Sequence, residues 1–154
     1  MTPYSSYVEG HDPLDVLRST LDGYRQVFAR NSAEKWAAPW APGKWTAHQL
    51  IVHVTQWELI FSTRVRMALA IPNYVVQPME QDELLNIEAP AVDARMASAA
   101  FEAVRQMNIN LVSALTPEQR AKKITHPERG AIDIEDLLVT LAGHAAHHLK
   151  QLAA

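Results

Sequence analysis

Four long segments of this sequence carry apolar residues at alternating spacings of three and four, and segments that contain proline separate them. Such spacing places the apolar side chains along one stripe of an α-helix. Proline lacks a backbone N–H and biases the residue before it towards extended geometry, so the intervening segments cannot continue the helices. The pattern therefore predicts an all-α fold in which four helices face a shared core, that is, a four-helix bundle.

Local signals set the expected helix boundaries. Asp12, followed by a proline, suits the N-cap of the first helix. Thr46 and Gln49 have the pattern of a capping box ahead of the second helix, and Asp133 with Asp136 repeats that arrangement before the fourth. In chain order, the expected helices cover residues 13–30, 47–70, roughly 92–115, and 134 to the chain end. The expected core-facing stripe of the third helix consists of Ala97, Ala100, Val104, Met107, Leu111 and Leu115.

The remaining segments are expected to be irregular. Residues 71–90 contain several prolines and an acidic run, which predicts a long connection between the second and third helices with about one helical turn. Residues 1–11 precede the first cap and are expected to form a flexible N-terminal tail. A chain of 154 residues has the size of one compact domain, so residues 1–154 are expected to form a single bundle.

Composition restricts the possible partners and cofactors. The formal net charge is −3 and no short window is dominated by Lys or Arg, so nucleic acid is not an expected partner. The chain has no cysteine, so a protein-bound metal ion must use His, Asp or Glu. No stretch resembles a signal peptide or a membrane span, which predicts a soluble cytoplasmic protein with no membrane partner.

Histidines stand on the predicted core face of two helices. His144 and His148 are four residues apart on the stripe of the fourth helix, so both rings lie over one point in space. His53 lies at the edge of the stripe of the second helix and is the natural third ligand, because inward-facing residues of different helices meet in a bundle core. His48 is turned roughly 140° from that stripe and is expected on the solvent side.

A second interpretation of each histidine is a core imidazole bonded to a carbonyl or a water, which is the commoner situation for a single buried histidine. Three inward imidazoles in one small core must each be satisfied or kept neutral, and one metal ion would do both. The spacing by itself leaves the two interpretations open.

Three stretches resemble the DinB/YfiT-like superfamily: residues 45–58, 126–130 and 143–151, with the sequences WTAHQLIVHVTQWE, HPERG and GHAAHHLKQ. The resemblance extends over about residues 13–152 and implies a four-helix bundle of the up-down-down-up type. It also implies that His53, His144 and His148 bind one divalent metal ion, typically zinc or nickel. His147 matches a position that is not a ligand in the family, and it is expected beside the ligands or at the surface. A homodimer is compatible with the resemblance and with the apolar helix faces.

Two classes of function follow from a three-histidine site. The ion would keep an open coordination position, which favours a metal-dependent transferase or hydrolase acting on a small-molecule substrate, with a low-molecular-weight thiol as a possible cosubstrate. The alternative is a non-catalytic metal-binding stress-response protein, because no general base is evident. Gln56, Glu58 and Asn108 are candidate acid–base helpers, but none is assigned a catalytic role. A cavity lined by tryptophans and opening onto the ion would favour the enzyme, whereas a sealed core would favour the alternative.

Overall fold

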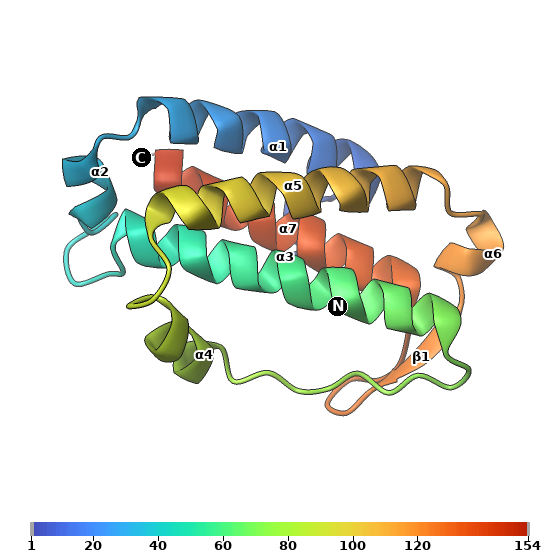
Figure 1. The fold of residues 1–154 in the computed structure, drawn as a ribbon. Helices are drawn as coiled ribbons and strands as arrows, with labels where there is room; N and C mark the ends of the chain where they lie inside the picture. The colour runs from blue at the N-terminus through green and yellow to red at the C-terminus, as the bar shows by residue number, and fades with distance from the viewer. Residues whose placement is uncertain (1, 154) are drawn as a thin grey trace.

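Four long helices carry the fold, and shorter elements connect them (Figure 1). The structure is a computed structural model that describes residues 2–153, so Met1 and Ala154, the ends of the expected domain, lie outside the described residues. The elements are, in order, a 3-10 helix η1 (Ser5–Tyr7), α1 (Pro13–Arg30), α2 (Ala33–Ala37), α3 (Ala47–Ala70), α4 (Gln81–Glu88), α5 (Ala94–Ser113), α6 (Pro117–Arg120), β1 (Lys123–His126), β2 (Gly130–Asp133) and α7 (Ile134–Ala153). The all-α four-helix bundle is confirmed, with the addition of a small hairpin.

The long helices run in an up-down-down-up order. In Figure 1, α1 and α7 run in one direction and α3 and α5 in the other, while α1 and α3 each contact both α5 and α7. Because α3 and α5 are parallel neighbours, the chain between them must return along the whole length of the bundle. Residues 71–93 make that crossover and include α4, which at eight residues is longer than the single turn expected. The predicted topology and the long connection are therefore confirmed.

Side-chain caps explain why the predicted boundaries agree with the structure. Thr46 and Gln49 exchange both bonds of the capping box, with Gln49 N to Thr46 Oγ1 at 3.1 Å and Thr46 N to Gln49 Oε1 at 2.9 Å. Asp133 and Asp136 exchange the same pair of bonds at 2.9 and 3.2 Å. Each device satisfies N–H groups that have no partner inside the helix. The helices α1 and α3 match the expected bounds, and α5 is slightly shorter than expected at both ends.

The segment before α7 is not wholly irregular. Strands β1 and β2 pair antiparallel, with Ile124 opposite Ile132 and both side chains buried. Gly130 begins β2 at φ 74°, a conformation that glycine adopts without steric cost. Two alternating strands of four residues are too short to give a clear period of two in the sequence. The hairpin packs beneath α7 and sets where that helix begins.

The predicted core face of α5 is only partly correct: Ala97 is buried, and Ala100, Val104, Leu111 and Leu115 are half-buried. Met107, expected inside, is 59% exposed, whereas Phe101, Arg105 and Asn108 are buried. The true core face of α5 carries a charge and an amide, so the apolar pattern singled out a neighbouring face of the helix instead. Such residues are buried almost only when they are paired, and the pairing could not be seen from α5 alone.

A buried ion pair supplies that partner and joins three helices. Arg105 donates to both carboxylate oxygens of Glu58, through Nε at 2.9 Å and Nη2 at 2.6 Å. Its Nη1 donates to Thr20 Oγ1 at 2.9 Å and to the Leu17 carbonyl at 3.3 Å on α1. Asn108 Nδ2 donates to Glu58 at 2.7 Å. Both charges are almost fully excluded from solvent, and their hydrogen-bonding groups are satisfied by α1, α3 and α5.

The N-terminal segment packs against α7, which differs from the flexible tail expected for residues 1–11. Val8 is buried, and the Tyr4 ring meets the rings of Trp57 and His144 edge-on. Tyr4 approaches α7 at Gly143 so closely that a Cβ there would collide with the Tyr4 carbonyl oxygen. The missing side chain at Gly143 is therefore what allows residues 2–8 to lie on α7.

We predict that Arg105→Met alone will destabilise the protein strongly, by roughly 3–5 kcal/mol, because it leaves the Glu58 carboxylate buried without a counter-charge. The double variant Glu58→Leu/Arg105→Met should recover most of that loss, because it buries no charge. Urea unfolding monitored by circular dichroism gives both values. A loss below about 1 kcal/mol in the single variant would contradict the structural role given to the pair.

We predict that Gly143→Ala will detach residues 2–8 while leaving the bundle folded. Limited proteolysis or hydrogen exchange of this segment should then show loss of protection. Gly23→Ala is the matched control, because a Cβ at Gly23 meets only the flexible side chain of Leu149. Equal protection in the two variants would show that the Tyr4 contact does not hold the segment.

Candidate metal centre

Helices α3 and α7 bring His53, His144 and His148 together in the bundle core. One ring nitrogen from each can be chosen so that all three lie within 4.8 Å of one another, and the three residues are 2%, 1% and 7% exposed. The Nε2 atoms of His53 and His144 are 3.0 Å apart. The sequence predicted this convergence, because His144 and His148 stand one turn apart on the buried stripe of α7 and His53 faces them from α3.

The donor set fits a single divalent cation. Bonds of about 2.0–2.1 Å to a tetrahedral zinc ion place two nitrogens about 3.3 Å apart, which is close to the 3.0 Å between His53 Nε2 and His144 Nε2. The Nδ1 atoms of His53 and His144 are buried and have no hydrogen-bond partner in the described structure. Without an ion, one of these two Nε2 atoms can donate to the other across 3.0 Å, whereas a bound ion would accept a lone pair from each of the three rings. The residues therefore fit an ion, and they fit zinc and nickel equally well.

A chain of hydrogen bonds fixes the orientation of His148. His148 Nδ1 is 2.6 Å from Gln151 Oε1, so it carries the proton and donates to this oxygen, because an amide oxygen only accepts. Gln151 Nε2 lies 3.3 Å from His147 Nε2, and His147 Nδ1 lies 2.7 Å from the Tyr7 hydroxyl. Each bond of this chain then pairs one donor with one acceptor, and the Nε2 lone pair of His148 is left facing the other two histidines. A hydrogen bond of this kind commonly orients a metal-binding histidine.

Aromatic rings enclose the other sides of the cluster. Trp57 stacks flat on His144, with ring centroids 3.8 Å apart and an interplanar angle of 9°. The Tyr4 ring meets His144 edge-on at 5.3 Å, and Trp45 contacts His53 at 5.0 Å. These contacts keep water from two of the imidazoles, so His148 is the histidine nearest to solvent.

Burial keeps the three imidazoles neutral. Desolvation, with a smaller contribution from His148, lowers the pKa of His53 from 6.5 to about 3. Desolvation also lowers the pKa of His148 to about 4, although its bond to Gln151 opposes the shift. Desolvation likewise lowers the pKa of His144 well below its usual value, and the repulsion that a protonated His144 would meet from the other histidines and Arg105 adds to the shift. Only a neutral ring can coordinate a metal ion, so the cluster is in a binding-competent state at neutral pH.

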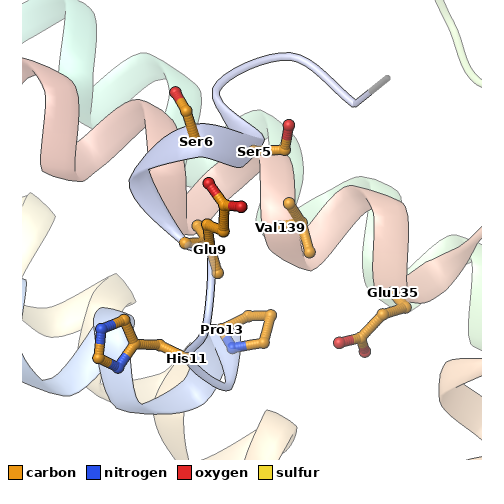
Figure 2. Close-up of a pocket in the computed structure, with 8 residues that line it drawn as sticks. Ser5, Ser6, Glu9, His11, Pro13, Glu135 and Val139 are labelled. Atoms are coloured by element: carbon orange, nitrogen blue, oxygen red, sulfur yellow. The ribbon is translucent and has the colours of Figure 1, made fainter.

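A cavity of about 340 Å³ reaches the cluster at His148. Trp40, Trp45 and Gln151 also line it. The connector between α1 and α3 thus gives this cavity an aromatic lining, whereas Trp57 is stacked on His144 and does not line it. The pocket drawn in Figure 2, between residues 5–13 and α7, includes His11 and Glu135 and none of the three histidines.

Other polar residues considered from the sequence lie apart from the cluster. Glu58 and Asn108 belong to the buried network of Arg105, and Gln56 Nε2 donates to Glu88 at 2.7 Å. His48, expected in solvent, is half-buried, with Nε2 2.7 Å from the Val92 carbonyl oxygen. None of these groups faces the cluster, so none supplies an acid or a base to it.

Sequence reasoning missed two residues that support the cluster. Gln151 lies three positions after His148 on the same helix, a spacing that places two side chains side by side and could have identified it. Tyr7 could not have been found in this way, because it belongs to a segment with no helical pattern and reaches α7 only through the fold.

The family model described as the DinB superfamily matches residues 17–152 of this chain. A relative from Oceanobacillus iheyensis, named as a proposed metal-dependent hydrolase, is 25% identical over 112 residues. The match covers 73% of this chain and 65% of that relative, so this chain corresponds to under two thirds of the relative's length.

Two solved structures have the same fold. YfiT from Bacillus subtilis, described as a candidate metal-dependent hydrolase with an unusual four-helix bundle topology, superposes with a TM-score of 0.82 at 18% identity, over 92% of this chain and 82% of that one. A mycothiol-dependent maleylpyruvate isomerase superposes with a TM-score of 0.73 at 14% identity, over 92% of this chain and 60% of that one. At these identities the likeness concerns the fold alone.

We predict that the metal-free protein will lose stability as the pH falls from about 6.5 towards 4. Lowered histidine pKa values mean that the unfolded chain takes up protons in this range while the folded chain does not, so stability is full above pH 6.5 and declines below it. The slope is at most about 1.4 kcal/mol per pH unit for each such histidine. Urea unfolding of chelator-treated protein at several pH values measures it. His53→Ala should flatten the profile, and an unchanged slope would show that these rings do not cause it.

Proposed function

Because this chain belongs to the DinB superfamily, we propose that it is a metal-dependent enzyme acting on a small molecule, with one divalent ion held by His53, His144 and His148. The observation that carries the proposal is the convergence of three buried, neutral imidazoles, one of which, His148, lines a cavity. A closed structural site would surround its ion with four protein ligands, whereas this cluster offers three.

The ion would supply a free coordination position, at which a water or a thiol loses its proton near neutral pH. The side chains of the protein would orient the ligands, exclude water and line the entrance. Gln151 holds the His148 ring so that Nε2 faces the centre. Trp57 covers one face of His144 and keeps water away from it. Trp40 and Trp45 line the entrance and would contact the apolar part of a substrate.

The reaction proposed is a hydrolysis or a group transfer. Hydrolysis is supported by the name of the Oceanobacillus iheyensis relative, and transfer with a low-molecular-weight thiol by the name of the mycothiol-dependent structural neighbour. Zinc and nickel are the ions proposed, because imidazole ligands suit both. The cytoplasmic location and the homodimer remain predictions. None of the helices within residues 2–153 is long and apolar enough to cross a membrane.

The alternative, a non-catalytic metal-binding stress-response protein, also rests on a specific observation. Glu58, a carboxylate on α3, is fully engaged by Arg105 and Asn108 and is not available as a general base. Glu58 would therefore not take up a proton from a substrate or a water in a hydrolysis at this site.

We predict that the protein, purified without a polyhistidine tag, binds about one zinc or nickel ion per chain and that His53→Ala, His144→Ala and His148→Ala each abolish tight binding. Each variant removes one of only three ligands. Elemental analysis gives the stoichiometry, and calorimetric titration gives the affinity.

His48→Ala is the matched control and should bind as the unaltered protein does. His147→Ala should keep one ion per chain, with a smaller loss of affinity because it interrupts the hydrogen bonds that reach His148 through Gln151. Loss of binding in His147→Ala together with full binding in His53→Ala would refute the ligand set.

Catalysis is tested by assaying the metal-loaded protein on a panel of small esters and amides and on an electrophile with a low-molecular-weight thiol. We expect turnover that chelation removes and that the readdition of metal restores. Tight metal binding without turnover on any substrate class would favour the non-catalytic alternative.

A further inference from the structure

A second cavity, of about 240 Å³, lies on the far side of Trp57 from the histidines and contains a buried guanidinium. Arg64 lines this cavity and is only 8% exposed. Its Nη2 donates to the Gln77 carbonyl at 2.6 Å, and its Cζ lies 4.9 Å from the centre of the Phe61 ring. Within the described residues, no carboxylate comes within 4.0 Å of this guanidinium. A buried charge without a counter-ion is costly, and such a group in a native structure requires an explanation.

Neighbouring groups add to the positive character of this cavity. Arg129, which lies 3.9 Å from Asp136, and His126 also line it, and Arg129 and Arg64 help to lower the pKa of His126, after burial itself. The Trp57 indole Nε1, a donor only, is buried without an acceptor in the described structure. Glu80 and Glu128 lie at the exposed rim, where water screens their charge. The cavity thus presents buried donors, and the two carboxylates that line it, Glu80 and Glu128, are exposed to solvent.

We propose that this cavity binds the carboxylate of a small organic acid, with the carboxylate paired to the Arg64 guanidinium. A guanidinium offers a planar pair of donors that matches the two oxygens of a carboxylate. A bound carboxylate would also supply the counter-charge that the chain itself does not provide.

The walls of the cavity indicate what the carboxylate is attached to. Trp57, Phe61, Pro78, Met79 and Leu137 contribute apolar surface. An inorganic anion would leave this surface wet, whereas an aromatic or short aliphatic acid would cover it. An organic monocarboxylate therefore fits better than free phosphate.

This site is separate from the metal centre, and the proposal does not depend on the function proposed above. The Trp57 ring lies between them, with His144 stacked at 3.8 Å and Phe61 stacked at 4.9 Å. Carboxylate binding should therefore persist in protein from which metal has been removed. Removing the metal also ensures that a carboxylate added in a binding experiment cannot bind to the ion instead.

Calorimetric titration of chelator-treated protein with benzoate tests the proposal. We expect a dissociation constant on the order of 1 mM, as suits so small a ligand, and no binding of the uncharged benzamide. Arg64→Gln should weaken benzoate binding roughly tenfold to a hundredfold, the effect of losing a charged hydrogen-bond partner. Arg66→Gln is the matched control, because Arg66 lies on the same helix, bonds to Ser62 and Asn108, and does not line the cavity.

A second measurement does not depend on the folding of the Arg64 variant. The indole N–H resonance of Trp57, identified by its loss in Trp57→Phe, should shift as benzoate is added to the unaltered protein. Binding of benzamide as tight as that of benzoate, an unchanged Trp57 resonance, or full binding in Arg64→Gln would overturn the proposal. Inorganic phosphate binding more tightly than benzoate at the same residues would overturn its assignment to organic acids.

Discussion

The bidentate ion pair between Glu58 and Arg105 is the constraint on which the arrangement of the helices depends. It fixes how α3 faces α5, and the bonds from Arg105 to Thr20 and to the Leu17 carbonyl tie both helices to α1. Turning α3 by a single residue, about 100°, would remove Glu58 from its partner and would also turn His53 away from α7. Since a buried charge without its partner is strongly unfavourable, the same interaction that holds the bundle selects the rotation at which three imidazoles can meet.

Most of the fold could be predicted from local patterns in the sequence. The predictions failed where contacts between residues far apart in the sequence determine the structure. Caps such as Thr46 with Gln49 act within four residues, so they gave correct helix starts. The core face of α5 was misjudged because Arg105 looks like a surface residue until Glu58, nearly fifty positions earlier, is placed beside it. The hairpin escaped notice because four-residue strands are too short to establish an alternating pattern.

The histidine cluster shows the same division between local and distant information. A separation of four residues on one buried stripe was enough to pair His144 with His148, and the bundle geometry brought His53 to them. The residues that surround the cluster could not be predicted as well from the sequence. Tyr4 and Tyr7 reach it from a segment without periodicity, and they can do so because Gly143 leaves room on α7 for the chain to pass. Contacts made by irregular chain depend on the finished fold and leave little trace in the local sequence.

The parallel arrangement of α3 and α5 has a consequence for how such proteins diversify. It requires a crossover, residues 71–93, that runs outside the bundle and contributes Pro78 and Met79 to the wall of the cavity around Arg64. The histidines stand on α3 and α7, whose positions the core determines. Insertions or substitutions in the crossover would therefore alter which small molecule fits without displacing the three imidazoles. The topology thus places some of the residues that shape this cavity on a different segment of the chain from the histidines.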